Sequence, residues 1–237
     1  IDVAERLVDA RPDRTGQTLH ARAIPLDDRA TYALVASGET TGVFQLESLG
    51  MQQMLKRLRP DCFEDIIAAV ALYRPGPMSS KFHEEFIEVK HGMRPMRRLH
   101  PQVAAVLEPT HGVPVYQEQV MQIAQRLAGF SLGRADVLRR AMGKKNPEEM
   151  AEQKQGFVEG ARAQGVSERE AATVFEEVEG FAAYGFNKSH SAAYAAITYQ
   201  TAFLKAHYPA ELFAALLTAD QDKIEKVVRT IAEARAW

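Results

Sequence analysis

Residues 180–209 read GFAAYGFNKSHSAAYAAITYQTAFLKAHYP and combine a polar loop with a long apolar segment. Two glycines, Gly180 and Gly185, lie among aromatic and hydrogen-bonding side chains, which is typical of backbone that passes close to another group. Core packing of Tyr184 and Phe186, followed by ordinary helix capping, would explain the same composition. The concentration of unlike hydrogen-bond donors favours a binding loop.

The second half of this stretch predicts a long helix. From Ala192 to His207 the charge is confined to Lys205, and apolar residues fall on nearly every side, as in a fully buried helix. Ser189 or Ser191 is the expected N-cap, and a proline two residues after His207 is expected to end the helix. We therefore expect a buried helix whose positive N-terminal end carries the polar loop. Such an end attracts anions, phosphate in particular.

Helical spacing continues along the rest of the chain. Apolar residues recur every three or four positions over 120–127, and a serine cap begins a further helix over 131–142. We also expect a helix over 43–58 and a loop over 93–109. The sequence shows no long β-alternation and no tandem repeat. The predicted fold class is mainly α, an irregular multi-helix array with little or no β.

The composition is that of an ordinary globular chain. Of 237 residues, 46% are hydrophobic and 25% are charged, and the formal net charge is -2. Any contact with nucleic acid must therefore depend on local patches and not on overall charge. The single cysteine, Cys62, excludes a disulfide framework and a CxxC zinc site.

The two ends of the chain and its apolar runs give further expectations. No apolar run reaches membrane-spanning length and no signal peptide is present, so we expect no membrane association. The chain begins without Met inside a predicted helix and ends inside another. We therefore expect it to be a piece of a longer protein.

A cluster of cations follows residue 131 in the segment SLGRADVLRRAMGKKNPEEM. Lys144 and Lys145 lie at the end of the predicted helix, where cations gain about 0.3–1 kcal/mol from the helix dipole. Arg139 and Arg140 lie in the helix body, which the dipole does not explain. Because the planar guanidinium group suits phosphate oxygens, we expect a triphosphate or a nucleic-acid backbone as the partner.

Three acidic residues near residue 60 are explained by helix capping. Asp61, Glu64 and Asp65 lie where a predicted helix begins, and acidic side chains favour that position. We therefore predict no metal site here.

Five segments carry a resemblance to a known family. They are GETTGVFQLES (38–48), LRPDCFEDIIAAVALYRPGP (58–77), VYQEQVMQIAQ (115–125), GRADVLRRAMGKKNPEEM (133–150) and YGFNKSHSAAYA (184–195). In content and order they resemble the alpha subunits of bacterial DNA polymerase III, the C-family replicative DNA polymerases. The resemblance covers nearly the whole chain from about residue 20.

The resemblance implies that this is a fragment from the fingers domain, a helical domain that reaches over the nascent base pair. In this family the metal-binding aspartates belong to the palm domain, in a region that precedes Ile1. We therefore expect no catalytic and no metal-binding residue in the chain, and an inactive isolated fragment. Mg²⁺ is the expected cofactor of the intact enzyme, bound by the palm.

The resemblance also implies the site residues. Those expected at the incoming nucleotide are Arg139, Arg140, Tyr184, Phe186, Asn187, Lys188, Ser189 and His190. Those expected at the DNA are Arg74, Gln117, Lys144 and Lys145. One departure from the family pattern is Pro114, where relatives usually have an apolar residue other than proline; it leaves the local backbone geometry open and does not affect the expected function.

The predicted function is that of the fingers segment of a DNA-directed DNA polymerase, which positions the dNTP and the template-primer DNA. We expect residues 1–110 to be the palm-proximal part and residues 111–237 the nucleotide-contacting part. In the intact protein, a sliding clamp and other replicase subunits are the expected partners, and the cytoplasm, at the nucleoid, is the expected location. Two alternatives stay open: an error-prone paralogue of the same subunit, and a non-catalytic helical module that binds nucleic acid or protein.

Overall fold

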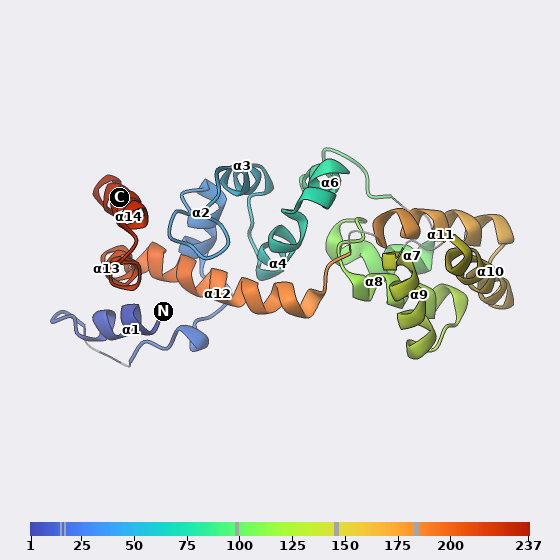
Figure 1. Cartoon of the computed structure of the whole chain (residues 1–237), viewed down its shortest axis with the longest axis horizontal. Helices are drawn as coiled ribbons and strands as arrows, with labels where there is room; N and C mark the ends of the chain where they lie inside the picture. Colours follow the sequence, from blue (N-terminus) through green and yellow to red (C-terminus); the bar gives the residue numbers. More distant parts are fainter. Residues whose placement is uncertain (15, 17, 98–99, 145–146, 183–184) are drawn as a thin grey trace. The chain divides into compact units, whose positions relative to one another are not determined.

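The computed structural model is helical throughout the part of the chain that it describes (Figure 1). The described residues are 1–14, 16, 18–97, 100–144, 147–182 and 185–237; the side chains of residues 144, 147 and 182 are not described. Among these residues no strand is found, and the mainly α prediction is confirmed.

The chain divides into two compact units. Unit 1 comprises residues 1–70 and 192–237, and unit 2 comprises residues 71–191. This division follows the packing of the helices, whereas the boundary between residues 110 and 111 was expected on functional grounds. The functional boundary stays a prediction.

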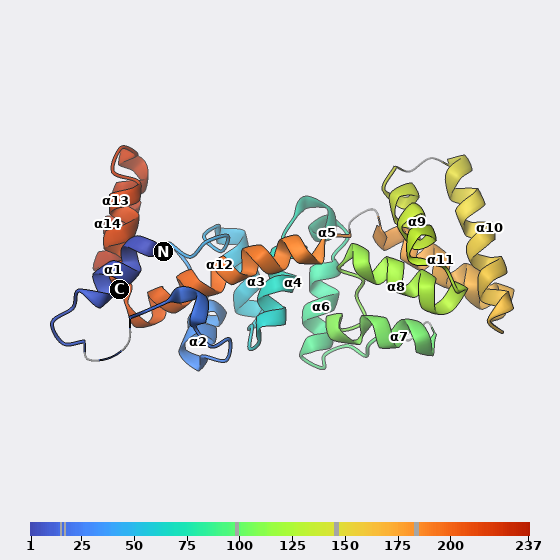
Figure 2. The ribbon, with the colours of Figure 1, turned by 90° about the horizontal axis from the view of Figure 1, so that it is seen from below.

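Unit 1 is built from helices at both ends of the chain. Their bounds are α1 Asp2–Asp9, a 3-10 turn Ala21–Ala23, α2 Arg29–Ser37, α3 Leu49–Leu58, α4 Phe63–Leu72, α12 Lys188–His207, α13 Pro209–Ala219 and α14 Ile224–Ala236. Helices α4 and α12 each share a few residues with unit 2. Helix α1 packs on α13, and α13 packs on α14, as both views show (Figures 1 and 2). Ala4 of α1 and Leu212 of α13 are buried in one cluster with Leu204 of α12.

Helix α12 begins at Lys188, before either of the expected caps. Oδ1 of Asn187 accepts the backbone N–H of His190 at 2.8 Å, which makes Asn187 the capping side chain. The expectation that Ser189 or Ser191 caps this helix is wrong. Asparagine is as good an N-cap as serine, so the sequence pattern could not separate the three residues.

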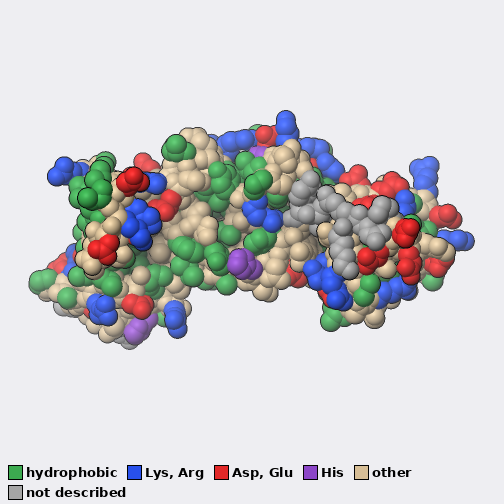
Figure 3. Space-filling view, viewed as in Figure 1, with side chains coloured by type: hydrophobic (Ala, Val, Ile, Leu, Met, Phe, Trp, Pro, Cys, Tyr) green, Lys and Arg blue, Asp and Glu red, His purple; other side chains and the backbone are tan. Residues whose placement is uncertain are grey.

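Helix α12 is also less uniformly buried than predicted. Ile197 exposes 39% of its surface, and hydrophobic side chains are visible along the middle of α12 in Figure 3. The charged residue, Lys205, is instead completely buried. Its Nζ donates to the carbonyl oxygens of Glu39 and Thr41 and to the carboxylate of Glu233, each at 2.8 Å. Three acceptors compensate for the loss of water around the ammonium group.

Unit 2 has a hydrophobic core of its own. Its helices are α5 Pro75–Ser79, α6 Phe82–Lys90, α7 Pro101–Leu107, a 3-10 turn Glu108–Thr110, α8 Gln117–Ala128, α9 Leu132–Lys144, α10 Pro147–Ala163 and α11 Glu168–Ala182. Helices α8 to α11 pack together, and α7 covers α8 (Figures 1 and 2). Leu127, Leu138, Phe157 and Phe175 are each exposed by 1% or less and form the centre of this core.

The helix expected over 43–58 begins later, at Leu49. Gly42 and Gln45 have φ angles of 81° and 65°, which a right-handed helix cannot contain. Ser48 then caps α3 through its hydroxyl oxygen. Thr40 and Thr41 precede this helix and lie outside it.

The loop expected over 93–109 contains a helix, α7. Pro101 takes its first turn, where a missing N–H costs nothing, and the ring of His100 accepts a backbone N–H as the cap. Val103, Val106 and Leu107 are buried in the unit 2 core. Burial of these residues stabilises a helix too short to be favoured by its own propensity.

Candidate functional site

The predicted site residues of unit 2 gather around the start of α8. The N–H of Phe186 donates to the carbonyl oxygen of Val115 at 3.0 Å, and the N–H of Gln117 donates to the carbonyl oxygen of Phe186 at 2.9 Å. These two bonds make a parallel bridge between Tyr116 and Phe186. The polar loop is therefore fixed to the segment that opens α8.

Gly185 allows this close approach. A Cβ atom at Gly185 would lie 3.3 Å from Cγ and 3.4 Å from the backbone N of Gln117. The expectation that glycine marks backbone held near another group is right at this position, and the other group is the protein itself. Gly180, in contrast, lies within α11, and a Cβ there would meet no described atom within 4 Å.

Gln117 also contacts the basic helix. Nη1 of Arg139 donates to Oε1 of Gln117 at 3.2 Å. The amide of Gln117 therefore joins an arginine of α9, while its backbone holds Phe186. One residue thus connects both informative stretches of the sequence.

The two arginines of α9 share a carboxylate. Nε and Nη2 of Arg139 lie 2.9 and 2.8 Å from Oδ1 of Asp136, and Nη2 of Arg140 lies 3.1 Å from Oδ2. The hydrogen bond from Arg139, with the charges of both arginines, lowers the pKa of the Asp136 carboxyl. The side chain of Arg139 is 27% exposed and that of Arg140 is 58% exposed. Arg139 therefore borders the apolar side of α9, and Arg140 faces away from it.

The N-terminal end of α12 is occupied by a carboxylate of the protein. Both carboxylate oxygens of Glu118 accept the N–H of Lys188 at 3.1 Å, and Oε1 also accepts Nδ2 of Asn187 at 3.0 Å. Since Asn187 itself caps His190, two first-turn N–H groups already have anionic or polar acceptors. The first turn of α12 therefore already has acceptors within the protein.

Arg74 lies against the polar loop. Its guanidinium carbon is 4.3 Å from the centre of the Phe186 ring, and its Nε donates to the carbonyl oxygen of Ala71 at 2.7 Å. The ring of His190 meets that of Phe186 edge to face at 5.4 Å. Burial lowers the pKa of Arg74, as expected for a cation that has lost water. A residue expected at the DNA thus contacts one expected at the nucleotide.

The exposed surface of the loop around Phe186 and of the first turn of α12 is polar. Phe186 is partly buried, whereas Lys188, Ser189 and His190 are exposed. The ammonium group of Lys188 lies 5.3 Å from the centre of the Tyr116 ring. Cations and aromatic edges therefore occur side by side at the start of α8.

Some of the predicted residues cannot be placed. Tyr184 and Lys145 lie outside the described residues, and so does the side chain of Lys144. Their expected roles stay predictions.

Two residues at the site were missed from the sequence. Asp136 precedes Arg139 and Arg140 by three and four residues, a spacing that places all three on one helix face. Glu118 lies beside Gln117, but its contact with the loop joins segments about seventy residues apart in the chain. The spacing of Asp136 was a usable signal, whereas nothing local indicated the partner of Glu118.

The described residues contain one group with metal-ligand atoms close together, Asp61, Cys62 and Asp65, in unit 1. Oδ2 of Asp65 accepts the N–H of Asp61 at 3.1 Å, which is the helix-start role predicted for these acids. A thiol is a poor ligand for hard cations such as Mg²⁺. Among the described helices, none is long and apolar enough to span a membrane.

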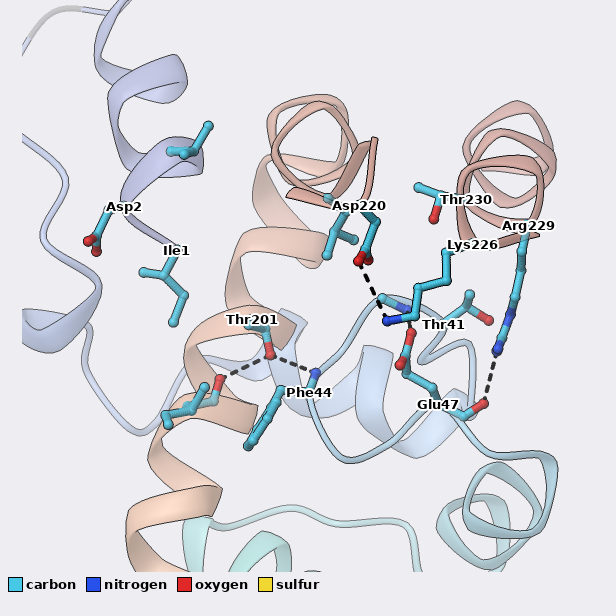
Figure 4. A pocket seen from close by; sticks show the side chains of 14 residues that line it. Ile1, Asp2, Thr41, Phe44, Glu47, Thr201, Asp220, Lys226, Arg229 and Thr230 are labelled. Carbon is cyan, nitrogen blue, oxygen red and sulfur yellow. Dashed lines mark hydrogen bonds and ion pairs between the residues drawn. The ribbon is translucent and has the colours of Figure 1, made fainter. Parts of the chain in front are cut away.

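Unit 1 also has a cavity of about 650 Å³, lined from α1, α12, α13, α14 and the turns before α3 (Figure 4). The hydroxyl oxygen of Thr201 accepts the N–H of Phe44 on its wall, and Arg229 donates to the carbonyl oxygen of Glu47. Among the described residues that line it, none was predicted as a site residue. The described residues that line the cavity do not include any of the cluster at α8.

Comparisons with known proteins agree on one family. Residues 1–165 match the family described as the bacterial DNA polymerase III alpha subunit finger domain. DNA polymerase III subunit alpha of Escherichia coli (strain K12) is 54% identical over 239 residues, which cover 98% of this chain and 21% of that protein. The same subunit of Pseudomonas aeruginosa is 56% identical over 217 residues, or 90% of this chain and 18% of its own. In Vibrio cholerae the identity is 54% over 99% of this chain and 21% of the relative. The chain thus spans about a fifth of the length of these curated relatives.

Proposed function

Because the chain belongs to the family of bacterial DNA polymerase III alpha subunit finger domains, we propose that it binds the incoming dNTP and the template-primer DNA of a polymerase. The observation that carries the proposal is the link through Gln117 between Arg139 and the Phe186 loop. It joins groups suited to phosphate with groups suited to a base. A dNTP presents both.

The arginines suit the triphosphate. Guanidinium groups bind phosphate oxygens with two parallel N–H donors, and charge-assisted bonds are about twice as strong as neutral ones. Arg139 and Arg140 lie on successive positions of one helix, with Arg140 the more accessible. The role of the two arginines is to neutralise the charge of the phosphates while the nucleotide is positioned for nucleotidyl transfer.

The loop suits a base or a sugar. The partly buried ring of Phe186 and the exposed ring of His190 offer aromatic surface, and stacking of a base on such a ring is worth about 1–3 kcal/mol. Asn187, Lys188 and Ser189 supply exposed polar groups beside it. Arg74, Gln117, Lys144 and Lys145 are proposed to contact the DNA.

The intact protein is proposed to be a DNA-directed DNA polymerase that uses Mg²⁺. The group formed by Asp61, Cys62 and Asp65 does not fit that ion, because it includes a thiol and a carboxylate already engaged with a backbone N–H. The metal ions are assigned to the palm, in the rest of the protein. The isolated chain is accordingly expected to show no primer extension, and template-dependent extension by purified chain would contradict this assignment.

The proposed setting is the bacterial cytoplasm, at the nucleoid. A sliding clamp and other replicase subunits are the proposed partners of the intact protein. The word "subunit" in the names of the relatives supports an assembly.

The experiment is the replacement of each arginine by glutamine in the full-length polymerase. A lost charge-assisted contact of about 1.5–3 kcal/mol predicts a fall of about ten- to a hundredfold in kcat/KM for the dNTP. Arg162→Gln is the matched control, because Arg162 is exposed by 62%, close to the 58% of Arg140, and lies in the same unit. Unchanged dNTP constants with weaker duplex binding would move Arg139 and Arg140 to a role at the DNA backbone.

A further inference from the structure

Asp136 lies one helical turn before both arginines of the proposed triphosphate site. Residues three and four positions apart share a helix face, so its carboxylate reaches Arg139 and Arg140 together. Each oxygen serves a different arginine: Oδ1 binds Arg139 and Oδ2 binds Arg140. The carboxylate is thus the common anchor of the pair.

The two arginines are anchored to different degrees. Nε and Nη2 of Arg139 bind Asp136 side-on, and Nη1 binds the amide of Gln117. These bonds use three of the five N–H donors of the guanidinium group and fix its plane from two directions. Arg140 makes one contact with Asp136, at 3.1 Å, and is the more exposed of the two. Arg139 is therefore fixed, and Arg140 has more freedom to move.

A carboxylate beside a triphosphate site has two opposite effects. Its charge repels the nucleotide, which weakens binding, and its hydrogen bonds orient the arginines, which favours reaction. Asp136 exposes 35% of its side chain, and solvent and salt screen the repulsion of a charge at the surface. Orientation by direct hydrogen bonds is not screened in this way. The orienting effect is therefore the larger.

We propose that Asp136 is a positioning residue that, together with Gln117, sets the plane of Arg139 for the triphosphate and leaves Arg140 free to adjust. This inference rests on the proposed function, since it assigns a role in dNTP use to a residue that acts through Arg139.

The test is Asp136→Asn in the full-length polymerase. Asparagine has nearly the helix propensity of aspartate, so α9 is kept while the charge and one acceptor are lost. In single-nucleotide incorporation on a template-primer we expect kcat to fall about tenfold, and KM for the dNTP to be unchanged or lower because a repelling charge is gone. Asp136→Glu, which restores the carboxylate, is expected to recover part of the lost kcat.

The matched control is Glu152→Gln, which removes one exposed carboxylate from α10 of the same unit. It is expected to leave both constants unchanged. A lower KM for Asp136→Asn with unchanged kcat would overturn the inference, because the carboxylate would then only repel the nucleotide.

A double variant separates this inference from the proposed function. If Asp136 acts through Arg139, adding Asp136→Asn to Arg139→Gln causes no further loss of kcat, whereas a full additional loss would overturn the inference. If Arg139→Gln itself leaves the dNTP constants unchanged, the proposed function fails and the inference fails with it. If Arg139→Gln is impaired and Asp136→Asn is not, the inference alone fails.

Discussion

Gly160 tests how closely α10 packs on α8 in unit 2. A Cβ atom built at this position would overlap the carbonyl oxygen of Ala128, and it would lie 3.2 Å from the carbonyl carbon. Because the obstacle is the backbone at the end of α8, no side-chain rotation can make room. Gly160→Ala therefore forces the two helices apart.

The magnitude follows from two opposing contributions. An added methyl group in a well-packed contact costs about 1–3 kcal/mol. Because the obstacle is backbone, we take the upper part of this range, about 2–3 kcal/mol. Alanine in place of glycine within a helix stabilises it by about 0.5–1 kcal/mol, so we expect a net loss of about 1–2.5 kcal/mol. For a chain of this size that loss lowers the melting temperature by about 2–10 °C.

Gly156 is a matched control on the same helix, one turn earlier. A Cβ atom there would meet Nη2 of Arg134, the end of a flexible side chain. The guanidinium group of Arg134 lies 4.0 Å from the centre of the Phe130 ring, and its displacement costs about 0.5–1 kcal/mol, close to the gain in helix propensity. Gly156→Ala should therefore be nearly neutral.

The assay is thermal and denaturant unfolding of the 237-residue chain, followed by circular dichroism. The reasoning predicts a clear loss for Gly160→Ala and almost none for Gly156→Ala. Equal effects of the two substitutions, or a gain for Gly160→Ala, would refute the close packing of α10 on the end of α8.

Three further predictions concern single side chains. Phe186→Ala in the full-length polymerase should lower kcat/KM for the dNTP about five- to 150-fold, since base stacking contributes about 1–3 kcal/mol, as measured by single-nucleotide incorporation; unchanged kinetics with a large drop in melting temperature would assign Phe186 to packing. Lys205→Met should lower the free energy of unfolding by about 3 kcal/mol in denaturant unfolding. This is the lower end of the cost of breaking a buried ion pair, because Glu233 keeps some solvent contact. An undiminished free energy of unfolding would contradict the prediction. Burial raises the pKa of Asp28, but the hydrogen bonds that its carboxylate accepts outweigh burial and hold the pKa below its ordinary value. This helix cap therefore contributes its full stability above about pH 4, and that stability is lost as the pH falls through the folded-state pKa. Asp28→Asn should make the free energy of unfolding fall less steeply as the pH is lowered through this range. An equally steep fall in the variant would contradict the prediction.

The parts of the fold that depend on local chemistry could be predicted. Ser131 caps α9 as the sequence predicts, and Gly129 ends α8 in the left-handed region that glycine favours. The apolar positions of α9, such as Leu138, are buried as their spacing predicts. In these cases a side chain bonds to its own segment, or a pattern repeats within one helix, so the signal is contained in a few residues.

The parts that depend on distant partners could not be predicted. Lys205 is buried because two backbone carbonyls and Glu233 surround it, and no local pattern specifies those acceptors. The start of α12 at Lys188 depends in the same way on Glu118, which lies far away in the sequence. At the candidate site, the sequence led to the proposal of the arginines and the aromatic residues, whereas tertiary contacts determine how they are oriented.

The arrangement of the two units along the chain has a consequence for biosynthesis. Unit 2 occupies residues 71–191 and is inserted between the two segments of unit 1. On a ribosome that adds roughly 5–20 residues per second, unit 2 is complete before the second segment of unit 1 has been made. Helix α12, which supplies the buried Lys205, reaches the first segment only after that delay. The apolar surface of the first segment of unit 1 therefore stays exposed while unit 2 folds. A nascent chain would most need a chaperone during this interval.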